Sequence, residues 1–340
     1  MSTRRAILQT VTAALAAPLV ARTARGQGTG LITVRGVYSA PGITYAGLFL
    51  ATRKGLWEKN GLSAQLRQVQ GGPLGMAALT NSDADFAGLS STDPVIGWDK
   101  GIKTLTISAF TGGLATQFSA RKDWLSARGI TASASAVDKI KALKDARVGV
   151  ATIGGGPAQY VRYLARSNGL DPETDMKLLA VGFGAARIAA LRTNQVDVTV
   201  GDAPEVDQIE AAGFGELYIN CATDMPVFRD FPYTIASVTP TYAEQNPEAT
   251  RRIARAIGDA NDLFFTSFGE AVDLMRAQYA TVDPKLIEKS LIRDRETFPR
   301  AGRMTEAMWH NNLEVALATK MISAPIAAQE GVIWTNRFNT

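Results

Sequence analysis

The chain alternates short strand-like runs with helical patterns from Leu31 onward, and this alternation constrains its fold more than any other feature. It is typical of β-α-β units and of sheets with parallel strands. The first set of predicted strands covers residues 31–38, 64–69, 86–89 and 104–109. The second set covers residues 147–151, 177–181, 196–200 and 217–220. The pattern therefore predicts an α/β protein with two sheet-centred halves.

Helical patterns fill the intervals between these strands. In the first half they cover residues 45–59, 74–80 and 94–100, and in the second half residues 157–168, 185–193 and 205–212. Beyond Thr241 the pattern is helical, and Ile253, Ile257 and Phe264 share one helix face. That apolar face needs a sheet to cover. The segment 233–238 is strand-like and is expected to return the chain to the first half.

The two halves repeat a small pattern, which suggests an internal duplication. A glycine, a leucine and an aspartate follow one another at spacings of seven and six residues, as Gly72, Leu79 and Asp85 and again as Gly184, Leu191 and Asp197. Shortly after each of these patterns, an aspartate and a proline stand at an expected helix start. They are Asp93-Pro94 in the first half and Asp202-Ala203-Pro204 in the second half. The alternative is chance similarity between any two β-α-β units.

The length of 340 residues fits two domains, because domains average about 150 residues. We expect lobe one to comprise residues 27–120 and 235–340, and lobe two residues 121–234. The two crossings between them, near residues 117–122 and 231–238, would form a hinge. Open α/β sheets bind ligands beyond the carboxyl ends of their strands, so a ligand cleft is expected between the lobes.

Residues 1–26 have the parts of an export signal. Arg4 and Arg5 precede an apolar stretch at residues 6–21, and small residues surround an expected cleavage point near Gly26. The paired arginines fit the twin-arginine route, and the general secretory route fits as well.

Four arginines and no acid precede residue 27, so the remaining chain has 32 basic and 32 acidic residues. This balance argues against a nucleic-acid partner and predicts a soluble periplasmic protein.

The sequence contains little that could carry catalysis. Its one histidine, His310, lies in a helical stretch at residues 306–318, and we expect it at the surface. Cys221 is the one cysteine, so no internal disulfide forms and a packed thiol is expected. We therefore predict no catalytic residues, no metal site and no cofactor.

Glycine-rich and small polar loops follow the predicted strands, and the helices that begin there would point their N–H groups into one cleft. Aromatic side chains at Tyr45, Phe110 and Phe183 could form a wall. The predicted ligand-binding residues are Ser39, Thr44, Tyr45, Gly71, Gly72, Ser90, Ser91, Thr92, Gly154, Gly155, Gly156 and Phe183. The loops lack Lys and Arg, so a neutral heteroaromatic or an aromatic carboxylate is as good a candidate as an oxyanion.

Five segments together resemble a known family: residues 55–62 (GLWEKNGL), 85–87 (DFA), 142–150 (ALKDARVGV), 169–172 (GLDP) and 191–197. Their order and spacing are similar to those of ABC-importer solute-binding proteins for nitrate, taurine, aliphatic sulfonates and thiamine-pyrimidine precursors. The resemblance runs from about Leu31 to Phe338.

The resemblance implies a two-lobed type II periplasmic binding protein fold. It also implies a small ligand, namely a sulfonate, nitrate, a pyrimidine or an aromatic acid, and delivery of that ligand to an inner-membrane permease. We expect a monomer that does not turn its ligand over. The alternatives are an enzyme of the thiamine-pyrimidine synthesis type, whose cysteine-rich segment this chain lacks, and a ligand-sensing periplasmic partner.

Overall fold

The structure is a computed structural model that describes residues 30–131 and 133–339. The predicted export signal at residues 1–26 lies outside the described residues. Residues Leu31–Thr340 belong to one compact unit. Within the described part of the chain, no helix is both long enough and apolar enough to cross a membrane.

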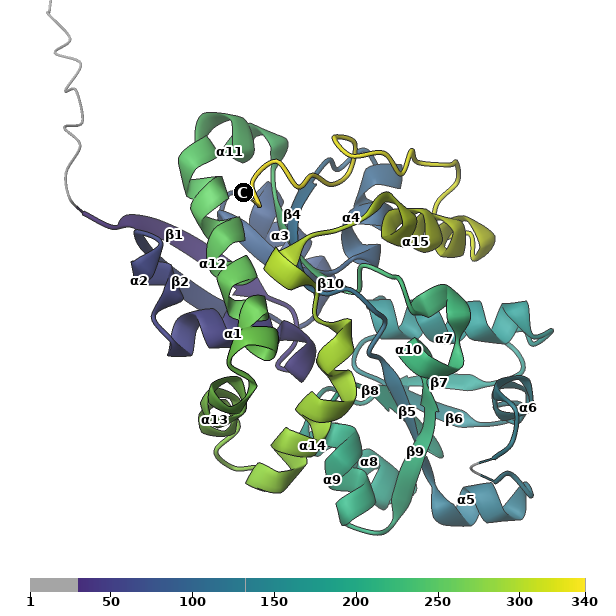
Figure 1. Cartoon of the computed structure of the whole chain (residues 1–340). Coiled ribbons are helices and arrows are strands. Elements are labelled where there is room, and N and C mark those ends of the chain that lie inside the picture. The colour runs from purple at the N-terminus through teal and green to yellow at the C-terminus, as the bar shows by residue number, and fades with distance from the viewer. Residues whose placement is uncertain (1–29, 132, 340) are drawn as a thin grey trace, which may run out of the picture. The chain divides into compact units, whose positions relative to one another are not determined.

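Two five-stranded sheets form the centres of this unit, as the sequence predicts (Figure 1). The first has the order β2-β1-β3-β10-β4, with β1 Ile32–Tyr38, β2 Leu62–Gln68, β3 Phe86–Ser90, β4 Leu105–Thr111 and β10 Thr234–Val238. The second has the order β7-β6-β8-β5-β9, with β5 Gln117–Arg121, β6 Arg147–Val150, β7 Lys177–Ala180, β8 Val198–Gly201 and β9 Gly215–Asn220.

Each sheet contains one antiparallel strand, and here the expectation of parallel sheets was wrong. Strand β10 runs antiparallel to β3 and β4, and β5 runs antiparallel to β8 and β9. These two strands carry the chain between the sheets, so they enter without the crossover helix that parallel pairing requires. The expected lobe boundary after residue 120 falls inside β5. A division by sheet would place it before Gln117, and the lobe division itself stays a prediction.

The two sheets match in strand order and in one set of side-chain contacts, while the internal duplication itself stays a prediction. In each sheet an aspartate just before the third strand in the sheet order, β3 or β8, accepts hydrogen bonds from an arginine on the neighbouring strand, β1 or β6. Arg35 donates to Asp85 from its backbone N at 2.7 Å and from Nη2 at 2.8 Å. Arg147 donates to Asp197 from the same two atoms, at 2.9 and 2.6 Å. The two halves therefore share one design, and equivalent positions can be compared between them.

The part of the chain that forms the first sheet also contains helices α1 Ala46–Arg53, α2 Leu56–Lys59, α3 Gly72–Thr80 and α4 Thr92–Asp99. The predicted single helix at residues 45–59 is wrong, because Gly55 has φ +68° and separates α1 from α2. Positive φ is readily adopted by glycine and ends the regular helix there.

Helices α5 Lys122–Ala127, α6 Ala136–Lys141, α7 Gly156–Ser167, α8 Ala185–Arg192, α9 Glu205–Ala211 and α10 Cys221–Asp224 lie along the part of the chain that forms the second sheet. Short 3-10 turns are η1 Ile43–Tyr45, η2 Pro226–Phe228, η3 Arg295–Thr297 and η4 Arg300–Gly302.

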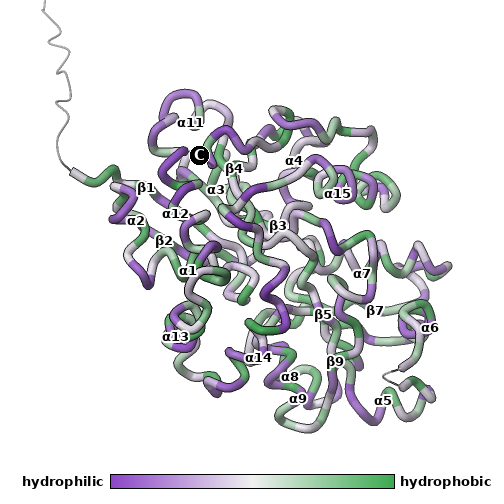
Figure 2. Tube along the Cα trace, in the orientation of Figure 1, coloured by the Kyte–Doolittle hydropathy of each residue, from purple (hydrophilic) through white to green (hydrophobic). Residues whose placement is uncertain are grey.

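The C-terminal part is helical, as expected: α11 Pro240–Gln245, α12 Pro247–Thr266, α13 Phe268–Gln278, α14 Pro284–Asp294 and α15 Glu306–Ala318. Ile253, Ile257 and Phe264 of α12 are fully buried in one cluster with Ile107 and Ala236 of the first sheet. Figure 2 shows α12 changing between hydrophilic and hydrophobic colours along its length. The apolar face of α12 therefore covers the first sheet.

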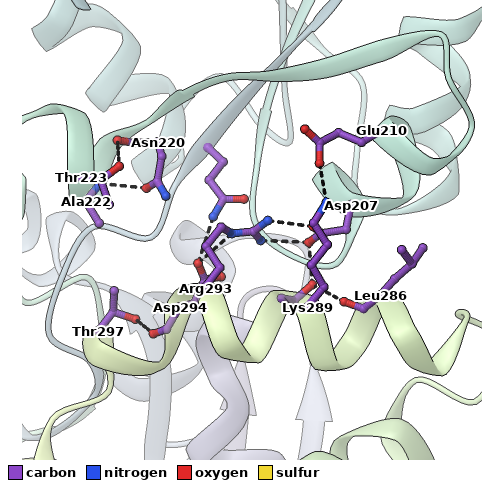
Figure 3. A network of polar contacts seen from close by, with 12 residues as sticks. Asp207, Glu210, Asn220, Ala222, Thr223, Leu286, Lys289, Arg293, Asp294 and Thr297 are labelled. Atoms are coloured by element: carbon purple, nitrogen blue, oxygen red, sulfur yellow. Dashed lines mark hydrogen bonds and ion pairs between the residues drawn. The ribbon is translucent and has the colours of Figure 1, made fainter. Parts of the chain in front are cut away.

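An ion network joins α14 to α9 (Figure 3). The Asp207 carboxylate of α9 is fully buried, and it accepts from Arg293 Nη1 at 2.8 Å and Nη2 at 2.9 Å. Ser290 Oγ donates to it at 2.6 Å, and Lys289 Nζ lies 3.3 Å away. This network ties a helix of the C-terminal part to the second sheet's side of the molecule.

Candidate functional site

A cavity lies where the carboxyl ends of strands from both sheets meet. Ser39 follows β1, and Ser90 ends β3, both in the first sheet. Gly155 follows β6 and Phe183 follows β7, both in the second sheet. Of the predicted ligand-binding residues, those that line the cavity are Ser39, Tyr45, Gly71, Gly72, Ser90, Gly155, Gly156 and Phe183. The structure therefore brings most of the predicted loops together.

Four predicted residues and one predicted wall aromatic do not line this cavity. Thr44 is buried beneath it, and Ser91 Oγ instead accepts a hydrogen bond from Asn312 of α15. Thr92 Oγ1 lies 3.1 Å from Ser90 Oγ, behind the lining. Gly154 borders a neighbouring groove. Phe110 is fully buried in the core of the first sheet, where its ring centre lies 5.6 Å from that of Tyr45.

Asp93 is a lining residue that the predicted list lacks. It lies in the first turn of α4, and its Oδ2 accepts from the backbone N of Ser90 at 3.0 Å. Burial raises the pKa of Asp93 to about 7, and the Ser90 hydrogen bond only partly opposes this. A Cβ on Gly72 would lie 2.0 Å from Asp93 Oδ2, so this carboxyl group needs a glycine beside it.

Asp202 is the corresponding residue after β8, and it also lines the cavity. Its Oδ1 accepts from Tyr233 Oη at 2.8 Å, and Thr44 Oγ1 lies 3.4 Å from Oδ2. Burial raises the pKa of Asp202 to about 6, although Arg187 and the Tyr233 hydrogen bond act to lower it. Thr44 thus supports the site through Asp202.

Arg187 brings a guanidinium group to the cavity that the loop sequences do not reveal. It lies in the first turn of α8, where Nε donates to Glu205 Oε2 at 2.6 Å and Nη1 donates to the carbonyl oxygen of Val200. Burial acts to lower the pKa of Arg187, but the adjacent Glu205 carboxylate outweighs burial and raises it. The expectation of a site without Lys or Arg was therefore wrong.

Glycines allow loops of the two sheets to meet beside the cavity. A Cβ on Gly156 would lie 2.3 Å from Ser90 Oγ, and a Cβ on Gly71 would lie 3.4 Å from Thr152. Tyr160 of α7 reaches the same Ser90 hydroxyl, with 3.1 Å between the two oxygens. Gly156 has no positive φ, so its close contact with Ser90, and not backbone strain, is the reason for a glycine there.

The cavity is small in this arrangement. About 40 Å³ is open to the centre of a water-sized sphere, which is room for a few water molecules. A larger groove of about 480 Å³ by the same measure adjoins it, and Asp93 borders both. The groove is bordered mainly by α3, α4 and Gly154. A ligand bigger than a few atoms therefore needs the two sides of the cavity to separate.

The one histidine and the one cysteine of the chain lie away from this cavity. His310 is exposed on α15, and its Nε2 lies 3.6 Å from Glu314 Oε1. Cys221 is fully buried, and burial raises the pKa of its thiol. Both positions agree with the sequence-based expectation.

The family model of NMT1-like proteins matches residues 40–271, which include every strand except β1 and every residue of the cavity lining except Ser39. The chain belongs to the NMT1-like family. Its resemblance to solute-binding proteins is thereby confirmed. A curated relative of this NMT1-like protein is YtlA from Bacillus subtilis (strain 168), named as a proposed binding protein. The two are 22% identical over 260 residues, which are 74% of this chain and 72% of YtlA.

Solved structures similar to the NMT1-like protein include two from bacterial binding proteins. The alkanesulfonate-binding protein SsuA from Xanthomonas axonopodis pv. citri, bound to MOPS, has a TM-score of 0.68 at 15% identity, covering 88% of this chain and 97% of SsuA. The periplasmic nitrate-binding protein NrtA from Synechocystis PCC 6803 has a TM-score of 0.63 at 16% identity, covering 76% of this chain and 70% of NrtA. The predicted two-lobed α/β fold of periplasmic binding proteins is therefore confirmed.

Proposed function

We propose that this protein is the periplasmic solute-binding component of an ABC importer. It captures a small ligand between the two sheets and delivers it to an inner-membrane permease. The observation that carries the proposal is the cavity lined by strand-end loops of both sheets. Export with cleavage near Gly26 and a monomeric mature protein belong to the same proposal.

The absence of a catalytic constellation among the described residues favours binding over turnover. The cavity lining contains two carboxyl groups, one guanidinium group and two tyrosines, and none of these forms a nucleophile-base pair. Ser90 Oγ, a hydroxyl of the lining, is engaged by Thr92 and Tyr160, which are not bases at neutral pH. The site is therefore suited to holding a solute unchanged.

A thermal-shift screen tests the proposal. The mature protein is heated with sulfonates, nitrate, pyrimidines, aromatic acids, amines and amidines, and each compound is recovered and analysed by mass spectrometry afterwards. A ligand in hundredfold excess over its Kd adds about 2.7 kcal/mol to the free energy of unfolding. We expect at least one compound to raise the melting temperature and to be recovered unchanged.

Two outcomes would overturn the binding function. A stabilising compound that is consumed would identify an enzyme, and a screen without any stabilising compound would remove the solute-binding proposal. Binding of the liganded protein to its permease in vitro, measured against the unliganded form, separates transport from a sensing role.

A further inference from the structure

We propose that the ligand of this cavity is a small organic cation with N–H donors, such as an amine or an amidine. The carboxyl groups of Asp93 and Asp202 would hold it. This inference rests on the proposed solute-binding function and names the chemical class of the solute. It disfavours nitrate and simple sulfonates, which the family resemblance alone leaves open.

The charge of the cavity lining carries the inference. Arg187 is the cationic side chain of the lining, and Glu205 pairs with it through a 2.6 Å contact. This pair is close to neutral as a whole. Among the described residues, neither Asp93 nor Asp202 forms an ion pair. The one guanidinium group therefore faces more than one carboxyl group, since it pairs with Glu205 and its charge also acts on Asp202. A ligand anion would lie beside an excess of carboxyl groups.

The hydrogen-bonding capacity of these carboxyl groups agrees with a donor ligand. Asp93 Oδ2 accepts from the Ser90 backbone, and Oδ1 makes none of the hydrogen bonds found among the described residues. Asp202 Oδ2 has the Thr44 hydroxyl at 3.4 Å, a long contact that leaves acceptor capacity. A ligand N–H group would satisfy these oxygens, whereas a nitrate or sulfonate oxygen could not donate to them.

The two carboxyl groups approach the cavity from equivalent places in the repeat. Asp93 follows β3 and Asp202 follows β8, which occupy the same position in the two sheets. The phenol of Tyr45 lies close enough to both carboxyl groups for their charges to act on it. The two aspartates therefore flank one space from opposite halves of the protein and could hold the two ends of one planar group.

Aromatic rings complete a cation-compatible lining. Tyr45 and Tyr233 border the cavity, and the faces of aromatic rings attract cations. Phe183 also borders it, but the Arg187 guanidinium already lies 5.7 Å from the centre of its ring. No three His, Cys, Asp or Glu side chains among the described residues gather into a group that could hold a metal ion. The arrangement thus suits an organic cation better than a metal.

Proton exchange on binding gives an independent readout. The phenols of Tyr45 and Tyr160 and the backbone N–H of Ser90 interact with Asp93. The titratable groups that interact with Asp202 are Arg187, Tyr233, Glu205, Asp294, Tyr45, Tyr279 and Cys221. Near pH 6.5 the two aspartates are partly protonated in the unliganded protein. A bound cation favours their ionised form and releases protons, whereas a bound anion favours the protonated form and takes protons up.

Matched pairs of ions of similar shape and opposite charge test the inference. The pairs are guanidinium and nitrate, acetamidinium and acetate, and benzamidinium and benzoate. Each is titrated calorimetrically into the mature protein at pH 6.5, in two buffers of different ionisation enthalpy. We expect the cation of at least one pair to bind at least about tenfold more tightly than its anion, a difference of about 1.4 kcal/mol. Protons should be released.

Asp93→Asn and Asp202→Asn keep the side-chain shape and remove the charge. Each should weaken binding of the preferred cation at least about tenfold. The matched control is Asp123→Asn, an aspartate that is 73% exposed beside Arg121 and remote from the cavity lining, and it should bind normally. Melting curves of each variant show whether it is folded. If either cavity variant fails to fold, the titrations of the matched ion pairs into the wild-type protein decide whether the cavity selects a cation.

Three results would overturn the inference. Tighter binding of the anions, proton uptake on binding, or equal affinity within every pair would each show that the carboxyl groups do not select a cation. Absence of binding by all six ions would overturn it as well. If another compound of the wide screen then binds unchanged, the solute-binding function stands without this ligand class. If no compound binds, the proposed function fails too.

Discussion

Gly156 and Ser90 meet at the boundary between the two halves of the cavity lining. The glycine was predicted from the sequence to let a ligand reach the backbone at the start of α7. In the structure the space beside its α-carbon is filled by Ser90, whose hydroxyl would lie 2.3 Å from a Cβ there. The sequence could indicate the turn but not its neighbour, because Ser90 is 66 positions away in the chain.

Gly156→Ala should weaken ligand binding about tenfold or more, because the added methyl group prevents the Ser90 and α7 loops from approaching. Ser90→Gly in the same chain removes the clashing atoms and should restore part of the affinity. Calorimetry with the ligand found by the screen measures both. Gly269→Ala, at an exposed glycine with no atom within 4 Å of the added Cβ, is the matched control. Unchanged affinity in a folded Gly156→Ala protein would contradict this account.

Asp93 and Asp202 make the unliganded protein sensitive to pH. Both folded-state pKa values, about 7 and about 6, lie above the ordinary value of 3.8, so the folded state binds more protons than the unfolded state between these limits. The contribution of these two groups to the free energy of unfolding is therefore fully present below about pH 4 and is lost as the pH rises through 6 and 7. Asp294, with a pKa of about 6, acts in the same direction. Asp197, whose pKa is lowered, acts only below this window.

The free energy of unfolding without ligand should therefore be lower at pH 8 than at pH 5. The difference should be a few kcal/mol at most, since one pKa unit corresponds to about 1.4 kcal/mol. Urea unfolding at both pH values measures it, and Asp93→Asn should reduce the difference. A protein that becomes steadily more stable from pH 5 to pH 8 would contradict the burial of these carboxyl groups.

Helices and strands differ in how far the sequence predicts them. The strands β1, β3, β6 and β7 and the helix α15 lie close to their predicted positions, because local periodicity reports which face is buried. The antiparallel entry of β5 and β10 was not predictable, since their partners are distant in the chain. Asp93 and Asp202 were noticed at helix starts, where a capping role is common. Arg187 gave no signal, because only folding brings it to Glu205 and the cavity.

The network between α9 and α14 in Figure 3 carries a prediction at this scale. Asp207→Asn removes the charge that Arg293 and Lys289 face, and it should cost about 2–4 kcal/mol of the free energy of unfolding. This expected cost is smaller than that of breaking a fully buried ion pair, because the Lys289 side chain is half-exposed. Asp273→Asn, whose partner is Arg276 on an exposed helix face, should cost less than about 0.5 kcal/mol.

Urea unfolding of these two variants at neutral pH makes the comparison. Equal, small effects of both substitutions would show that the network does not hold α14 in place.

At the scale of the whole molecule, one repeated design accounts for the two sheets and for the position of the cavity. Each half ends its central strands in loops of small residues, and each contributes one aspartate to a shared space. The composition and the alternation pattern predicted this two-sheet architecture. The ligand was not predictable from them, because it depends on which charged groups lie together after folding. Closure of the lobes about the two crossings stays a prediction.

The central claim is that the cavity between the two sheets holds the solute. A crystal structure of the protein with the tightest ligand of the screen tests it most directly. We predict electron density for the ligand within hydrogen-bond distance of Asp93 and Asp202, enclosed by loops from both sheets. Density at another place on the protein, with this cavity holding only water, would contradict the account.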